Sequence, residues 1–158
     1  MFHTSLLPLL LVIAASCSSL HSSANSAWSL QLKTSGGFAG IGTGSISLTS
    51  DRAFTYERAA RPREQRKPCE GKLSSEELQP INEAVAQSHP QEWNQPGLKV
   101  ASPDAFGYKL ELRTGDKEQP ITVQWYDNTR DQLPSDLRKL SDAVLQVMNT
   151  TAKKKCSS

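Results

Sequence analysis

The chain has 158 residues, of which 37% are hydrophobic and 22% charged, and its formal net charge is +2 at pH 7. This length suits one domain with a single modest core, and the small net charge provides no overall electrostatic basis for binding nucleic acid. Neither Cys69 nor Cys156 has a neighbouring Cys or His at ligand spacing, so we expect no metal site and no cofactor.

The N-terminal segment predicts export. Residues 6–15 form an apolar run that is too short to span a bilayer as a helix and is followed by small and polar residues. Ala14-Ala15-Ser16-Cys17 resembles the lipobox of bacterial lipoproteins, in which the cysteine becomes the acylated first residue; ordinary cleavage after Ser16 or Ala24 is the alternative. We expect a signal peptide over residues 1–16 and a Ser- and Ala-rich tether over residues 17–27. The protein would then be secreted or held in the bacterial envelope, meeting a membrane only through a lipid at Cys17.

An alternating pattern on both sides of a glycine-rich segment predicts a first β-hairpin. Its apolar members are Trp28, Leu30, Leu32, Ile46 and Leu48. Between them, Gly36-Gly37 suits the positive φ angles of a two-residue hairpin turn, because neither residue has a Cβ to clash there.

Phe38 directly follows this turn and is itself followed by small residues. In one interpretation the ring folds back into the core and the glycines shape a bulge. In the other the tip presents Phe38 to a partner, since an aromatic side chain on a tight loop can anchor in a recessed pocket. The candidate partner-binding residues are Ser35, Gly36, Gly37, Phe38 and Ala39.

The middle of the chain predicts a third short strand over residues 53–58, then a long polar loop, then a helix. Seven basic residues occur from Arg52 to Lys72, both included, interrupted by acidic residues, and we expect a solvated linker there. Ser74-Ser75-Glu76-Glu77 has the pattern of a capping box, and the apolar stripe that follows consists of Leu78, Ile81, Ala84 and Val85. Pro80 should kink this helix or delay its start. The helix should end before His89-Pro90, with His89 as a solvated residue near its C-terminus.

The C-terminal part predicts a second hairpin, with apolar alternation at residues 108–112 and 121–125, and a second helix. Leu133-Pro134-Ser135-Asp136 would begin this helix with proline in the first turn, and its apolar stripe is Leu137, Leu140, Val144 and Val147. The order ββ(β)αββα predicts an α+β fold, an antiparallel sheet of two hairpins with two amphipathic helices packed on one face. The domain would span residues 28–150, followed by a basic tail over residues 151–158.

The cysteines predict one disulfide. Cys17 is either lipidated or lost with the signal, which leaves Cys69 and Cys156. Two thiols in an oxidising compartment favour a bond between them, and this bond would tie the loop before the first helix to the tail after the last.

Three motifs occur in the order used by the emfourin family of peptidase inhibitors. They are Ser35-Gly36-Gly37-Phe38-Ala39-Gly40-Ile41 after a strand, Asp104-Ala105-Phe106-Gly107-Tyr108 leading into a strand, and the helix start at residues 133–140. The chain resembles this family, whose small α+β proteins block the active site of protealysin and related thermolysin-like zinc metallopeptidases. It departs from the family in its export signal, its expected disulfide and the basic insertion between Arg58 and Lys72.

The resemblance implies that a zinc metallopeptidase is the partner and that residues 35–39 enter its substrate cleft, with Phe38 in an apolar pocket. The alternative is a non-inhibitory envelope lipoprotein that uses the same fold for assembly or ligand binding. We do not expect an enzyme, because the mature chain has no His-Glu-x-x-His, Gly-x-Ser-x-Gly, phosphate loop or Cys/His pair. Asp104, Asp127 and Asp131 are explained as loop and turn residues.

Overall fold

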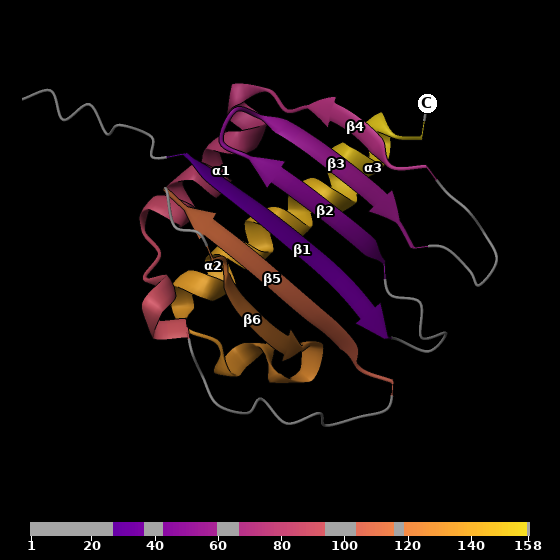
Figure 1. Cartoon of the computed structure of the whole chain (residues 1–158). Helices are drawn as coiled ribbons and strands as arrows, with labels where there is room; N and C mark the ends of the chain where they lie inside the picture. The colour runs from indigo at the N-terminus through magenta and orange to yellow at the C-terminus, as the bar shows by residue number, and fades with distance from the viewer. Residues whose placement is uncertain (1–26, 37–42, 60–66, 94–103, 116–118, 158) are drawn as a thin grey trace, which may run out of the picture.

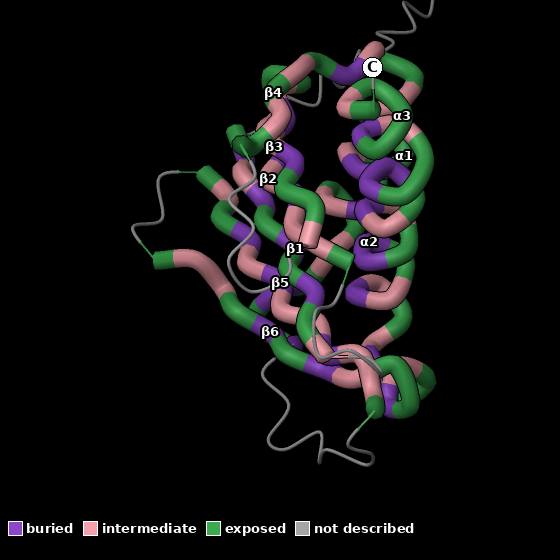
Figure 2. Tube along the Cα trace, turned by 90° about the vertical axis from the view of Figure 1, so that its right-hand side faces the viewer, coloured by how far each residue is buried: buried purple, intermediate pink, exposed green. Residues whose placement is uncertain are grey.

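The structure is a computed structural model that describes residues 27–36, 43–59, 67–93, 104–115 and 119–157. An antiparallel sheet of six strands has the order β4-β3-β2-β1-β5-β6 (Figure 1). Figure 2 shows the helices on one side of this sheet, so the predicted α+β class is confirmed. The strands are β1 (Trp28–Gly36), β2 (Gly44–Thr49), β3 (Ala53–Arg58), β4 (Cys69–Lys72), β5 (Phe106–Thr114) and β6 (Ile121–Tyr126). The helical segments are α1 (Ser75–Ala86), η1 (Pro90–Trp93), η2 (Asp127–Gln132), α2 (Ser135–Gln146), η3 (Val147–Ala152) and α3 (Lys153–Lys155).

Strand β1 lies at the centre and joins the two predicted hairpins into one sheet. Leu32 is opposite Ile46 of β2 on one side and opposite Leu110 of β5 on the other. All three side chains are fully buried, as the alternation of apolar residues predicts for the face that the helices cover. The alternate residues, such as Gln31, Ser47 and Glu111, occupy the opposite face.

Strand β4 corrects the prediction of an uninterrupted polar loop before α1. It pairs antiparallel with β3, and Gly71 stands opposite Phe54. An added Cβ on Gly71 would lie 2.7 Å from the Phe54 ring, so the close pairing requires a residue without a side chain. The sequence Cys-Glu-Gly-Lys has no apolar alternation, which is why the hydrophobic pattern does not indicate this strand.

Helix α1 begins where the capping box predicts. The Glu77 amide donates to Ser74 Oγ at 3.2 Å, and the Ser74 amide donates to Glu77 Oε2 at 2.7 Å. Pro80 lies inside the helix, and the helix starts at Ser75, so the expected delay does not occur. Of the predicted stripe, Leu78, Ile81 and Ala84 are buried and Val85 packs partly buried against the core.

Helix α2 also follows the prediction, with Leu137, Leu140 and Val144 fully buried. Pro134 occupies the N-cap position rather than the first turn. The helical turns continue through η3 and α3, and Ala152 is fully buried, so residues 151–155 extend the domain instead of forming a separate tail. Among the described residues, no helix is long and apolar enough to cross a membrane.

Candidate binding site at the β1–β2 loop

The predicted two-residue turn at Gly36-Gly37 is wrong. Strand β1 continues through Gly36, and β2 does not begin until Gly44, so residues 37–43 connect the two strands. The last β1–β2 pair is Lys33 with Ser45, whereas β1 remains paired with β5 as far as Gly36 opposite Phe106. Beyond Lys33, the end of β1 is therefore held by its pairing with β5 and no longer by pairing with β2.

The Thr34 hydroxyl holds the base of this connection. Thr34 is only 4% exposed, and its Oγ1 accepts hydrogen bonds from the amides of Thr43 and Gly44 at 2.7 and 2.9 Å. The same oxygen lies 3.0 Å from the Gly44 carbonyl, to which it can donate, and 2.9 Å from Thr43 Oγ1. One buried side chain thus replaces the ladder hydrogen bonds that end at Lys33, and it fixes where both strands leave the sheet.

Two glycines allow the backbones of β1 and β5 to meet at this end. Gly36 has a φ of +82°, and an added Cβ would lie 2.5 Å from the Ala105 carbonyl oxygen. An added Cβ on Gly107 would lie 2.9 Å from Ser35 Oγ and 3.4 Å from the Tyr126 ring. Only glycine fits at Gly36, where both the backbone angle and the space exclude a side chain.

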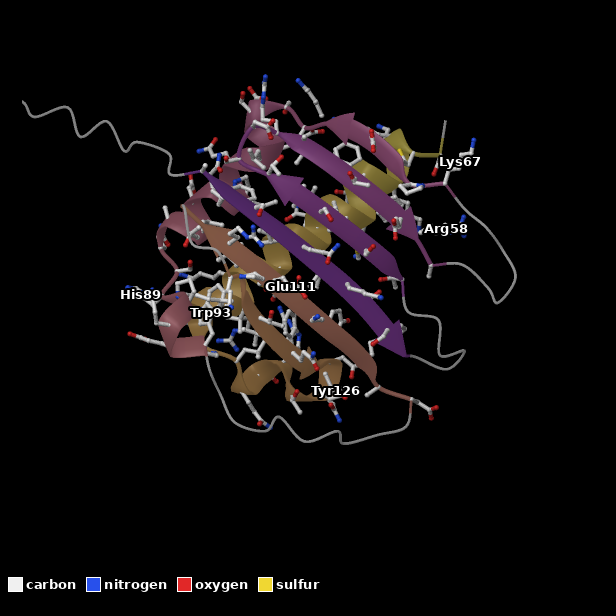
Figure 3. The ribbon with its side chains drawn as sticks, in the orientation of Figure 1. Arg58, Lys67, His89, Trp93, Glu111 and Tyr126 are labelled. Carbon is white, nitrogen blue, oxygen red and sulfur yellow. A yellow bond between two sulfur atoms is a disulfide. The ribbon has the colours of Figure 1, made fainter. Side chains whose placement is uncertain are left out.

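Half-buried aromatic side chains surround the same end of the sheet. Tyr108 stacks on the buried Trp125 with ring centroids 5.4 Å apart and planes 11° from parallel. Burial raises the pKa of Tyr108, the charge of Asp127 raises it further, and Arg130 opposes the change. Phe106 and Tyr126 are also half-buried, and Figure 3 shows Tyr126 at the end of β6. This end therefore combines apolar ring surface with a constrained backbone.

Of the predicted partner-binding residues, the structure describes Ser35 and Gly36, and both lie at the end of β1. Gly37, Phe38 and Ala39 lie outside the described residues, so the two interpretations of Phe38 both stay predictions. Cys17 and the predicted signal also lie outside them. The disulfide is confirmed, since Cys69 and Cys156 are bonded with their Cα atoms 5.8 Å apart.

A second polar cluster, centred on Asp136, has a structural role. The Asp136 carboxylate accepts hydrogen bonds from the His89 amide at 2.8 Å and from the Trp93 indole at 2.9 Å. Burial raises the pKa of Asp136, but these hydrogen bonds outweigh it, so that the pKa lies below its ordinary value. The His89 imidazole is 70% exposed, and its Nδ1 is 3.9 Å from the carboxylate. The two hydrogen bonds to Asp136 join η1 and the residue before it to the start of α2 (Figure 3).

The residues that the structure describes contain no group of three or more His, Cys, Asp or Glu side chains that could hold a metal ion. No family model matches the chain, and no curated protein matches it significantly.

Proposed function

We propose that the protein is an exported inhibitor of thermolysin-like zinc metallopeptidases and that residues 35–39 enter the substrate cleft of the enzyme. One observation carries the proposal. The two glycine-containing motifs of the emfourin resemblance are far apart in the sequence but adjacent in the sheet, with Ser35 opposite Gly107 and Gly36 opposite Phe106. The rings of Phe106 and Tyr108 therefore lie on the strand next to the one that leads into Phe38.

The anchored base supports binding by a loop of this length. The Thr34 hydroxyl and the fixed Gly36 backbone hold the points where residues 37–43 leave and rejoin the sheet. Less ordering entropy is lost on binding when both ends of a loop are already fixed. A buried aromatic anchor can then supply a large share of the affinity, and we assign this role to Phe38. The chain would resist cleavage if the bound loop cannot place a peptide bond in attack geometry.

The test is to titrate the purified, oxidised chain into a thermolysin-like peptidase and to measure hydrolysis of a peptide substrate. We expect inhibition that is competitive with substrate. Phe38→Ala should weaken it by about 2 kcal/mol, or roughly 30-fold, while the melting temperature stays unchanged. Lys139→Ala, on the exposed face of α2, is the matched control and should inhibit like the unmodified chain.

Two outcomes would contradict this assignment in different ways. If Phe38→Ala lowers the melting temperature and leaves inhibition intact, the ring belongs to the core and another surface, such as the Asp127–Gln132 segment, binds the enzyme. If the unmodified, folded chain inhibits no thermolysin-like peptidase, inhibition is wrong and the non-inhibitory envelope protein becomes the better hypothesis.

A further inference from the structure

A pocket of about 450 Å³ lies between the end of β3, the start of β4 and the C-terminal helical turns. It is lined by Tyr56, Arg58, Lys67, Lys153 and Ser157 and by the Cys69–Cys156 disulfide. Figure 3 shows Arg58 and Lys67 at the same edge of the molecule. The disulfide joins two of the walls covalently, so that β4 and the C-terminal turns cannot separate.

The three cations in this pocket are uncompensated. Among the described residues, none of Arg58, Lys67 and Lys153 has an ion-pair partner. Lys155, which comes two residues after Lys153, is different: its ammonium group donates to Glu77 Oε2 at 2.8 Å and to the Lys72 carbonyl at 3.0 Å. The structure thus neutralises one lysine of the C-terminal turn and leaves its neighbour at the pocket without a carboxylate.

Among the described residues no carboxylate lines the pocket, and strand geometry gives the reason. Successive side chains of a strand point to opposite faces, so Glu57 and Glu70 lie on the open face of the sheet when Tyr56 and Cys69 lie on the helix face. The Ser45 hydroxyl donates to Glu57 Oε2 at 3.4 Å on that open face. Glu57 and Glu70 are therefore on the wrong side of the sheet to balance the cations in the pocket.

A helix terminus alone does not account for this arrangement. Lysines in a last helical turn are favoured by the negative end of the helix dipole, and this explains Lys153 to Lys155. Arg58 and Lys67 reach the pocket from β3 and from the segment before β4, and neither residue belongs to a helix end. Cations from three segments repel one another in a concave site unless an anion enters it.

We propose that this pocket binds a phosphate-bearing ligand. A guanidinium group can bind two phosphate oxygens at once, and the two ammonium groups add point charges. The hydroxyl of Tyr56 is a further donor, and a volume of about 450 Å³ falls within the range of small-molecule sites. This activity is separate from the proposed peptidase inhibition, because its residues do not include residues 35–39.

The test is a calorimetric titration of the oxidised chain with pyrophosphate at constant ionic strength. We expect saturable binding that weakens at least about tenfold in the double variant Arg58→Gln/Lys67→Gln. The double variant Lys33→Gln/Lys139→Gln removes the same charge from exposed positions on β1 and α2 and should bind like the unmodified chain. Melting temperatures would show that both variants are folded.

Equal weakening in the two double variants, or a response that never saturates, would mean general charge attraction and would overturn the proposal. Vesicles of phosphatidylglycerol, with phosphatidylcholine vesicles as control, distinguish the sources of the phosphate. Anionic vesicles that bind the chain and release it when pyrophosphate is added would identify a lipid headgroup. Pyrophosphate binding without vesicle binding would identify a soluble phosphate compound.

Discussion

At one end of the sheet, β2 and β3 are joined within residues 50–52, whereas at the other end residues 37–43 separate β1 from β2. The short connection is closed by backbone hydrogen bonds, from the Arg52 amide to the Thr49 carbonyl at 3.0 Å and from the Leu73 amide to the Arg52 carbonyl at 2.9 Å. Beside it, the buried Trp28 donates its indole N–H to Asn82 Oδ1 at 3.1 Å. This end of the sheet is therefore closed by hydrogen bonds within the chain.

The end of the sheet beside residues 37–43 has a different construction. One hydroxyl, that of Thr34, takes the place of several backbone pairs, and the rings of Phe106, Tyr108 and Tyr126 stay half-exposed. Arg58, which has no ion-pair partner among the described residues, lies at this same end of the sheet, because it is opposite Gly44 at the start of β2. The contrast teaches that a single sheet can have a turn closed by its own hydrogen bonds at one end and the proposed binding residues at the other.

Removing the disulfide should produce the largest effect. Cys69 and Cys156 are 87 residues apart, so the bond restricts the unfolded chain strongly. The double variant Cys69→Ala/Cys156→Ala should lose up to about 4 kcal/mol of unfolding free energy in urea titrations. Reductant added to the unmodified chain should reproduce this loss. An unchanged unfolding free energy would show that packing of the buried Ala152 holds this edge without the bond.

Thr34→Val tests whether one hydroxyl secures the loop end. The valine keeps the volume but leaves the Thr43 and Gly44 amides without their acceptor, which should cost about 2 kcal/mol of unfolding free energy. Thr34→Ser keeps the oxygen and should lose much less. If the valine and serine variants have the same unfolding free energy in urea titrations, the Thr34 hydroxyl does not stabilise the base of the β1–β2 connection.

The periodic elements of the fold could be predicted from the sequence because burial imposes its own spacing. Leu32 and Leu137 follow strand and helix periods, and the Ser74 capping box marks the start of α1. Strand β4 has no such period. The contrast between Lys153 and Lys155 could not be predicted either, because two lysines of one helical turn differ only in which groups the folded chain brings to them.

The length of the β1–β2 connection could not be predicted for a related reason. Gly36-Gly37 has the composition of a tight turn, but β5 pairs with β1 beyond the last β1–β2 pair, and this contact is remote in sequence. Sequence reasoning placed the candidate site at residues 35–39, and this placement stays a prediction. It did not indicate the buried Thr34 hydroxyl, whose neighbours look like an ordinary alternating strand.

Asp136→Asn should show a pH-dependent loss of stability. The folded-state pKa of Asp136 lies below the unfolded value of about 3.9. The charged carboxylate therefore stabilises the fold above that pH, and the contribution disappears as the pH falls through the folded-state pKa. Urea titrations should show a difference of about 1.5 kcal/mol between variant and unmodified chain at pH 7. The difference should be smaller at pH 3. If it is the same at both pH values, the loss of stability comes from the shape of the side chain rather than from its charge.

The smallest expected effect lies in the self-contained turn. Arg52 has a φ of +77°, a backbone conformation that is unfavourable for a residue with a Cβ. Its two backbone hydrogen bonds do not depend on the residue type. Arg52→Gly removes that strain of about 1 kcal/mol but adds freedom to the unfolded chain, which leaves a gain of about 0.5 kcal/mol. Arg52→Ala is the control, because it removes the guanidinium group and keeps the Cβ. We expect the glycine variant to have a higher urea midpoint than the alanine variant. If the two midpoints coincide, the backbone at this turn holds no strain that glycine relieves, and the closed end of the sheet owes its stability to its hydrogen bonds alone.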